Sequence, residues 1–205
     1  RENRMDVSWV TRLNEWELAR FRYPNVHEAH ERIRARNDGS QPLEPPMRLS
    51  QVVLEPELAR QLNASPLAEV RFGWALVSCR ENEQGVEARI REMISGREET
   101  VRCKLLAGCD GAGSVVRQHL GYTWEGSQSV GRIYMVHFRS TCLELLQRFG
   151  VAWHYQSPVG GSLVAQDDRE TWTLHMPLRK SADAAAIEPV SLVQQCLGRE
   201  FPLEV

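Results

Sequence analysis

Residues 103–126 read CKLLAGCDGAGSVVRQHLGYTWEG, and this stretch is the most informative part of the sequence. An apolar segment leads into an Asp-Gly turn, and Ser114 then stands at the N-cap position of a short predicted helix over residues 115–120. Gly111 can adopt the positive φ that such a turn needs. Because the first amides of a helix favour anionic or polar groups, the stretch predicts a turn that can bind a ligand.

Asp110 limits what that ligand contact can be. A carboxylate would repel a phosphate, so Asp110 would act through water, through a sugar hydroxyl or by capping the turn. Taken alone, the same residues are better explained by an ordinary strand–turn–helix corner in which Asp110 and Ser114 are local caps.

Outward from this corner, alternating and β-branched residues predict two sets of strands. A small antiparallel meander is expected over residues 70–79, 85–93 and 100–107. A second, mostly antiparallel sheet is expected over residues 132–139, 151–155, 161–166 and 171–176. The fold class is therefore α+β or α/β.

The remaining segments read as follows. Ser50 is a plausible N-cap for a helix over residues 51–62, and further helices are expected over residues 141–149 and 189–197. Residues 7–13 alternate as a half-buried strand, residues 14–22 suggest a polar linker, and residues 23–36 suggest a polar loop.

These segments suggest a discontinuous layout in which the first part of the chain returns to pair with the last. Residues 1–40 and 131–205 would form one sheet domain in two segments, the second truncated. Residues 41–130 would form the middle part of a second domain. Because the chain begins with Arg and stops as a new strand begins, we expect it to be an internal part of a longer protein.

Composition excludes several classes of partner. With 25 basic against 27 acidic residues, the chain lacks the positive charge that attracts nucleic acid or anionic lipid. No apolar run is long enough to cross a bilayer, and residues 1–4 are not a signal peptide, so a cytoplasmic location is expected. Five cysteines without a CxxC pair argue against disulfides or zinc, and the spacing of His27 and His30 matches no metal motif. The oligomeric state stays open.

Residues 109–117, CDGAGSVVR, resemble the Asp-Gly motif of flavoprotein aromatic hydroxylases of the para-hydroxybenzoate and phenol hydroxylase type, the FAD_binding_3 family. Residues 48–58, RLSQVVLEPEL, are similar to the family's loop and helix that carries a flavin-contacting Gln or Arg. The resemblance spans nearly the whole chain. It departs at Gly113, where the family frequently has Arg.

By this resemblance, Gln51 would hydrogen-bond the ribityl or adenosine part of FAD, and Val77 would offer backbone groups to the adenine. Asp110 would lie near the pyrophosphate and the path of the nicotinamide, and Arg117 would brace the turn. Arg48 is a further candidate for a cofactor phosphate. The alternatives are a solvated first-turn residue for Gln51 and a surface ion pair for Arg117.

The resemblance implies an enzyme that uses NAD(P)H and dioxygen to hydroxylate an aromatic or polycyclic small molecule. Trp153, Tyr155 and His175 are candidates for the substrate pocket, although sheet-core packing also explains them. Because FAD carries the oxygen chemistry, no catalytic side chain is expected. Neither Gly-x-Gly-x-x-Gly nor a later Gly-Asp segment is present, so the 205 residues cannot complete an FAD site and would be inactive alone.

Two alternatives to this function remain at the level of sequence. One is a related flavoenzyme that halogenates, epoxidises or dehydrogenates its substrate. The other is a non-catalytic remnant or interaction module that keeps the fold without binding flavin.

Overall fold

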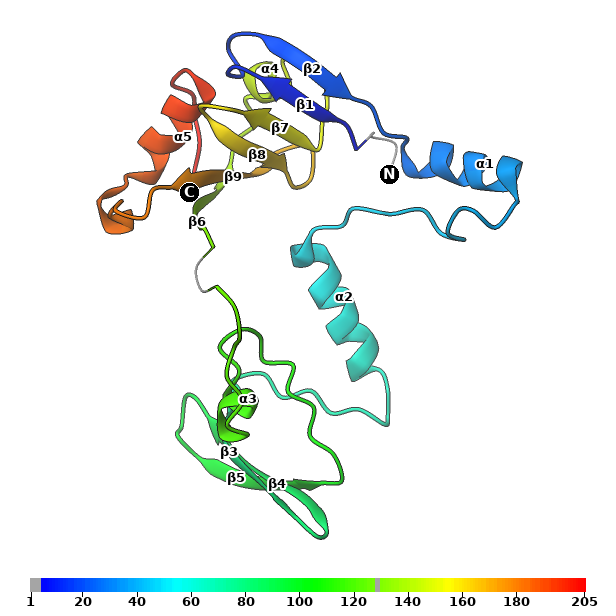
Figure 1. Ribbon diagram of the computed structural model, residues 1–205, viewed down its shortest axis with the longest axis vertical. Coiled ribbons are helices and arrows are strands. Elements are labelled where there is room, and N and C mark those ends of the chain that lie inside the picture. The colour runs from blue at the N-terminus through cyan, green and yellow to red at the C-terminus, as the bar shows by residue number, and fades with distance from the viewer. Residues whose placement is uncertain (1–4, 128–129) are drawn as a thin grey trace. The chain divides into compact units, whose positions relative to one another are not determined.

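The computed structural model describes residues 5–127 and 130–205 (Figure 1). The chain divides into two compact units, residues 1–54 with 129–205 and residues 55–128. The charged N-terminus at residues 1–4 and part of the predicted connection 126–131, residues 128–129, lie outside the described residues.

The first unit contains a six-stranded sheet in the order β2-β1-β7-β8-β9-β6 (Figure 1). Its strands are β1 (Val7–Val10), β2 (Glu17–Phe21), β6 (Arg132–Arg139), β7 (His154–Ser157), β8 (Gly161–Ala165) and β9 (Thr171–Leu178). β1 runs parallel to β7, and every other strand pair in this sheet is antiparallel. The predicted mixed fold with a mostly antiparallel sheet is confirmed, and the N-terminal segment pairs with the C-terminal one.

One face of this sheet carries the hydrophobic core. Alternate strand residues such as Trp172, Leu174 and Leu163 are almost fully buried. They pack with side chains from α4 (Leu143–Leu146) and α5 (Pro189–Leu197). Period-two alternation places one half of each strand in this core and leaves the other half on the opposite face.

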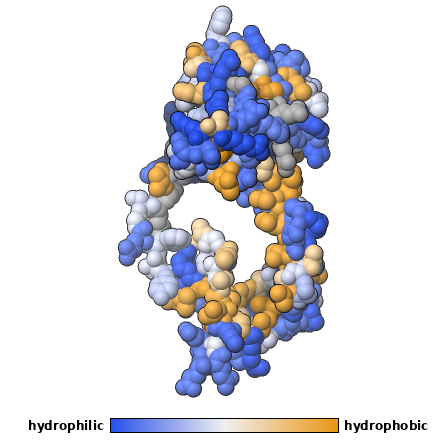
Figure 2. Space-filling model, turned by 90° about the vertical axis from the view of Figure 1, so that its right-hand side faces the viewer, coloured by the Kyte–Doolittle hydropathy of each residue, from blue (hydrophilic) through white to orange (hydrophobic). Residues whose placement is uncertain are grey.

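The second unit is an antiparallel meander of β3 (Trp74–Asn82), β4 (Gly85–Glu92) and β5 (Glu98–Cys103), followed by α3 (Val115–His119). These elements confirm the meander and the capped helix expected from the sequence. Among its described residues only Ala88 and Ser114 are buried, and many large apolar side chains are exposed. Figure 2 shows such apolar residues beside hydrophilic ones on the surface.

Helix α2 (Gln51–Asn63) matches the predicted helix and crosses the boundary between the units at residues 54 and 55. A short 3-10 helix, Ala184–Ala186, precedes α5. None of the helices within the described residues combines the length and the apolar character that a bilayer crossing requires.

Two predictions for the N-terminal segment were wrong. The expected polar loop contains α1 (Val26–Arg36), which begins at a capping box formed by Asn25 and Glu28. None of its residues is buried, which explains why apolar periodicity did not reveal it. The expected polar linker contains the edge strand β2, whose residues are mostly exposed.

Candidate functional site

The Asp-Gly corner lies between β5 and α3 and is open to solvent. Residues 107–113 are all exposed, and Gly111 adopts φ +74°. At Gly108 a Cβ atom would stand 2.8 Å from the Cβ of Val116, so a glycine is required where the incoming chain passes the helix. The corner therefore combines close backbone packing on one side with an accessible surface on the other.

Both carboxylate oxygens of Asp110 accept hydrogen bonds at the N-terminus of α3. Oδ1 accepts from the Ser114 hydroxyl at 2.5 Å, and Oδ2 accepts from the amides of Val115 at 2.6 Å and Val116 at 3.2 Å. The Ser114 hydroxyl is the largest influence that holds the pKa of Asp110 below its usual value, and the amide hydrogen bonds add to it. The carboxylate already satisfies the first amides of α3, so those amides are not free for a phosphate.

Arg117 braces the same turn. Its Nη1 donates to the carbonyl of Ala112 at 2.7 Å, and its guanidinium lies 4.8 Å from the ring centroid of Trp124. The indole nitrogen of Trp124 donates to the same carbonyl at 3.3 Å. Nε of Arg117 is buried and has no hydrogen-bond partner among the described residues. Trp124 is a supporting residue that sequence reasoning missed, although it lies within the informative stretch.

Val77 lies where β3 departs from regular pairing. The register of β3 with β4 shifts between Leu76 and Ser78, which leaves Val77 in a bulge. The Val77 carbonyl oxygen is 3.1 Å from Nε2 of His119 on α3. This contact ties the meander to the helix, and the role of His119 was not visible from the sequence.

In the first unit, Arg48 and Trp153 come together from distant parts of the sequence. The Arg48 guanidinium lies 5.5 Å from the Trp153 ring centroid, and its Nη1 is 3.8 Å from Oδ1 of Asp168. Burial lowers the pKa of Arg48, while the charges of Asp168 and Asp167 act in the opposite direction. Nothing in the sequence near Asp168 signalled this contact.

His154, at the start of β7, also belongs to this group of residues, which we call the Arg48 cluster (Arg48, Trp153, His154 and Asp168). Its ring centroid lies 4.2 Å from that of Trp153. Burial lowers the pKa of His154, and the charges of Arg48 and His175 lower it further. A neutral imidazole beside an arginine can accept a proton or a hydrogen bond.

A cavity of about 480 Å³ adjoins the cluster. Its walls are largely apolar and are formed by Met5, Val7, Tyr23, Pro46, Met47, Arg48, Leu49 and Trp153. Among the described residues, Arg48 is the one guanidinium in this lining.

The remaining predicted site residues are placed differently. Gln51 is exposed as the first residue of α2, three residues beyond Arg48. Tyr155 is 2% exposed within the core, where its hydroxyl donates to the Gly150 carbonyl at 2.7 Å and accepts from the Ala152 amide at 3.1 Å. Its polar group is therefore used inside the first unit rather than offered to a ligand.

His175 lies half-buried on the sheet face opposite the core, where β9 places it beside Ser162 of β8. In the adjacent row of the same face, His137 Nδ1 lies 2.9 Å from the Thr173 hydroxyl. Gln166 donates to that hydroxyl at 3.0 Å. This face is thus rich in imidazole, hydroxyl and amide groups, a feature that strand alternation alone did not identify.

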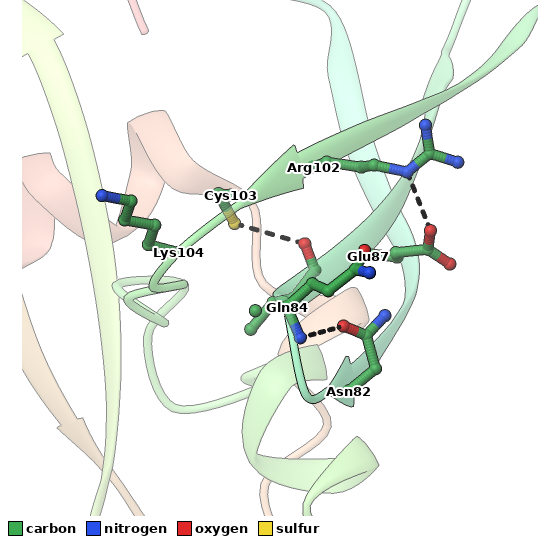
Figure 3. Close-up of a pocket in the computed structure, with 8 residues that line it drawn as sticks. Asn82, Gln84, Glu87, Arg102, Cys103 and Lys104 are labelled. Atoms are coloured by element: carbon green, nitrogen blue, oxygen red, sulfur yellow. Dashed lines mark hydrogen bonds and ion pairs between the residues drawn. The ribbon is translucent and has the colours of Figure 1, made fainter.

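A separate hollow of about 210 Å³ lies at the β3–β4 turn (Figure 3). Figure 3 shows Arg102 bound to Glu87 and the backbone amide of Gln84 bound to the Asn82 side chain. The Cys103 thiol is directed at the Val86 carbonyl. None of the residues predicted to bind a ligand lines it.

Comparison with known proteins gives a consistent picture. The FAD_binding_3 model, described as an FAD binding domain, matches residues 9–194. The FAD-dependent monooxygenase opdD of Penicillium oxalicum is 34% identical over 94% of the chain. The FAD-dependent monooxygenase apdD of Emericella nidulans is 32% identical over 94% of the chain. The chain spans 38% and 32% of the lengths of these two relatives.

Solved structures with the same fold include RebC in its substrate-free form and the flavin-dependent monooxygenase PieE in complex with FAD and substrate. RebC is 22% identical with a TM-score of 0.78, and the match covers 99% of this chain and 38% of that one. PieE is 24% identical with a TM-score of 0.76, and the match covers 95% of this chain and 34% of that one. These likenesses establish the architecture of the two units.

Proposed function

The chain belongs to the FAD_binding_3 family, and from that membership we propose that it is part of a flavin-dependent monooxygenase that hydroxylates an aromatic or polycyclic substrate with NAD(P)H and dioxygen. The observation that carries the proposal is the open Asp-Gly corner of the second unit. In that corner Asp110, Ser114 and Arg117 hold an exposed turn in place by their own hydrogen bonds.

The corner is compatible with a sugar or ribityl hydroxyl of FAD. Asp110 is exposed, and its Oδ1, which among the described residues accepts only from the Ser114 hydroxyl, can accept one further hydrogen bond. Its negative charge and the occupied amides of α3 argue against direct phosphate binding at this point. We therefore assign Asp110 to a hydroxyl of the cofactor and Arg117 to support of the turn.

Gln51 and Val77 complete the proposed cofactor contacts. Gln51 is exposed at the start of α2, where its amide has both a donor and an acceptor to offer. Val77 lies in a bulge, where backbone groups depart from the regular ladder. Arg48 is the further candidate for a cofactor phosphate.

The six-stranded sheet would supply the substrate wall. Trp153 offers an aromatic surface beside Arg48, and His175 lies on the sheet face that also carries His154 and Thr173. Tyr155 would support this wall from the core side of the sheet, because its hydroxyl fixes the backbone at Gly150 and Ala152. In these terms residues 1–40 and 131–205 form the substrate-binding sheet and residues 41–130 the middle of the FAD-binding domain.

FAD, when bound, supplies the redox and oxygen chemistry of such an enzyme. The described residues would orient the substrate ring and exclude water at the sheet face. The lowered pKa of His154 favours a neutral ring, which can accept a hydrogen bond from a polar group of the substrate.

The function is tested with the full-length protein that contains this chain. We expect it to bind FAD, to oxidise NADH or NADPH faster when a phenolic substrate is added, and to incorporate one atom of labelled dioxygen into the product. A halogenated, epoxidised or dehydrogenated product would favour a related flavoenzyme. A protein that ignores added FAD would refute the proposal and favour a non-catalytic module.

A further inference from the structure

Arg48 has hydrogen-bonding capacity that its neighbours do not use. Its contact with Asp168 is 3.8 Å, which is longer than a hydrogen bond. Its Nη2 is buried without a hydrogen-bond partner among the described residues. A guanidinium carries five donors, and leaving them unused away from water is unfavourable.

The surroundings of Arg48 restrict the ligand that could use these donors. Seven other residues of the described chain line the 480 Å³ cavity, and most of them present apolar side chains. A pyrophosphate carries more than one negative charge and needs several donors, which the described residues of this lining do not provide. A planar ring with a single acidic group matches the combination of apolar walls and one guanidinium.

Trp153 and Asp168 hold the guanidinium in place. The indole face lies under it at 5.5 Å, and Asp168 faces one of its ends. The Trp153 amide donates to the Asp6 carbonyl at 2.8 Å and its carbonyl accepts from the Ala165 amide at 3.0 Å, so the backbone below the ring is fixed. An arginine held in this way loses little conformational freedom when it binds an anion.

The geometry points to Arg48 as the residue that recognises an acidic group on the aromatic substrate, with the substrate's ring in the apolar cavity beside Trp153. This inference rests on the proposed function and adds to it the chemical class of the substrate. It also reassigns Arg48 from a cofactor phosphate to the substrate.

The test compares a matched acid and amide. Binding of 2-naphthoate and of 2-naphthamide to the purified protein is measured by calorimetry, without added flavin. Wild-type protein is compared with Arg48→Met, which removes the charge, and with Arg48→Lys, which keeps the charge but loses the planar fork. Arg36→Met, at an exposed position in the last turn of α1, controls for net charge. Circular dichroism checks that each variant is folded.

We expect wild-type protein to prefer the acid over the amide by at least about tenfold, as for one charge-assisted hydrogen bond. Arg48→Met should abolish this preference, Arg48→Lys should retain part of it, and Arg36→Met should leave it unchanged. Equal binding of acid and amide, or no acid binding at millimolar concentration, would overturn the inference.

A further arm separates the substrate acid from a cofactor phosphate. ADP, which carries the pyrophosphate found in FAD, is titrated into the same variants. Tight ADP binding that is lost in Arg48→Met would also overturn the inference and return Arg48 to the cofactor. Because these measurements use no flavin, failure of the full-length protein to bind FAD would be a separate result.

Discussion

Replacing Ser114 with alanine tests the construction of the Asp-Gly corner. The Ser114 hydroxyl donates to Asp110 at 2.5 Å and accepts from the Arg117 amide at 3.0 Å. Ser114 is only 8% exposed, so water does not readily replace either hydrogen bond. The substitution therefore removes the N-cap of α3 and the strongest influence on the Asp110 carboxylate together.

The expected cost follows from the cap. Replacing a serine N-cap with alanine costs about 1 kcal/mol. Since α3 is only five residues long, most of its amides depend on the cap and on Asp110. We expect local opening of α3 to become about 1 kcal/mol easier, which corresponds to roughly fivefold faster hydrogen exchange at the amides of Val115, Val116 and Arg117.

The carboxylate provides a second readout. Loss of the Ser114 hydrogen bond should raise the pKa of Asp110 toward its ordinary value of 3.8. Because the folded-state pKa is lowered, the stabilisation from Asp110 is present above the unfolded pKa and is lost as the pH falls through the folded pKa. The stability difference between wild type and Ser114→Ala should accordingly be greatest near neutral pH and shrink in acid.

Hydrogen exchange and carbon-detected NMR titration of Asp110 measure the two effects in one sample. Ser114→Thr is the matched control, because threonine keeps a capping hydroxyl and should remain close to wild type. Unchanged exchange and an unchanged Asp110 pKa in Ser114→Ala would refute this account of the corner.

Three further predictions concern the rest of the chain. Tyr155→Phe should destabilise the first unit by about 1–3 kcal/mol in urea unfolding, because the Ala152 amide loses its buried partner. If the variant is as stable as wild type, the hydroxyl is dispensable. Gly85→Ala should unfold at a lower temperature than wild type, since φ is +131° and the new Cβ would stand 2.3 Å from a carbonyl oxygen of β5. Gly113→Ala is the control, because its new Cβ meets open space. Equal melting temperatures of the two variants would contradict this prediction. Because the pKa of His154 is lowered in the folded protein, its contribution to stability is present above pH 6.5, its ordinary pKa, and is lost as the pH falls through its folded-state pKa. In His154→Gln, the free energy of unfolding in urea should therefore depend less on pH in that range. An unchanged pH dependence would count against this prediction.

Local signals in the sequence were sufficient to predict the corner and the meander. Ser114 as an N-cap and Gly111 in a turn are chemical requirements of neighbouring residues, and the structure contains both features. The helix at Gln51–Asn63 and the strand at Arg132–Arg139 were predicted for similar reasons. Helix α1 was missed although Asn25 begins a capping box, because charged residues and histidines outnumber the apolar residues along it.

The cluster around Arg48 shows what the sequence could not provide. More than 100 residues separate Arg48 from Trp153 and Asp168 in the sequence, and only the folded chain brings them together. Tyr155 and Trp153 looked equivalent as strand aromatics. The pleat directs Tyr155 into the core, whereas Trp153 lies just before β7 and lines the cavity.

Equilibrium titration of FAD into the full-length protein, as wild type and as Asp110→Ala, tests the central claim most directly. Asp38→Ala removes an exposed carboxylate elsewhere and is the matched control. We predict that wild type and Asp38→Ala bind FAD alike and that Asp110→Ala binds it at least about tenfold more weakly, because a hydrogen bond to a charged group is lost. Equal affinity in all three proteins, or no flavin binding by the wild type, would contradict the claim that the corner at Asp110 faces the cofactor.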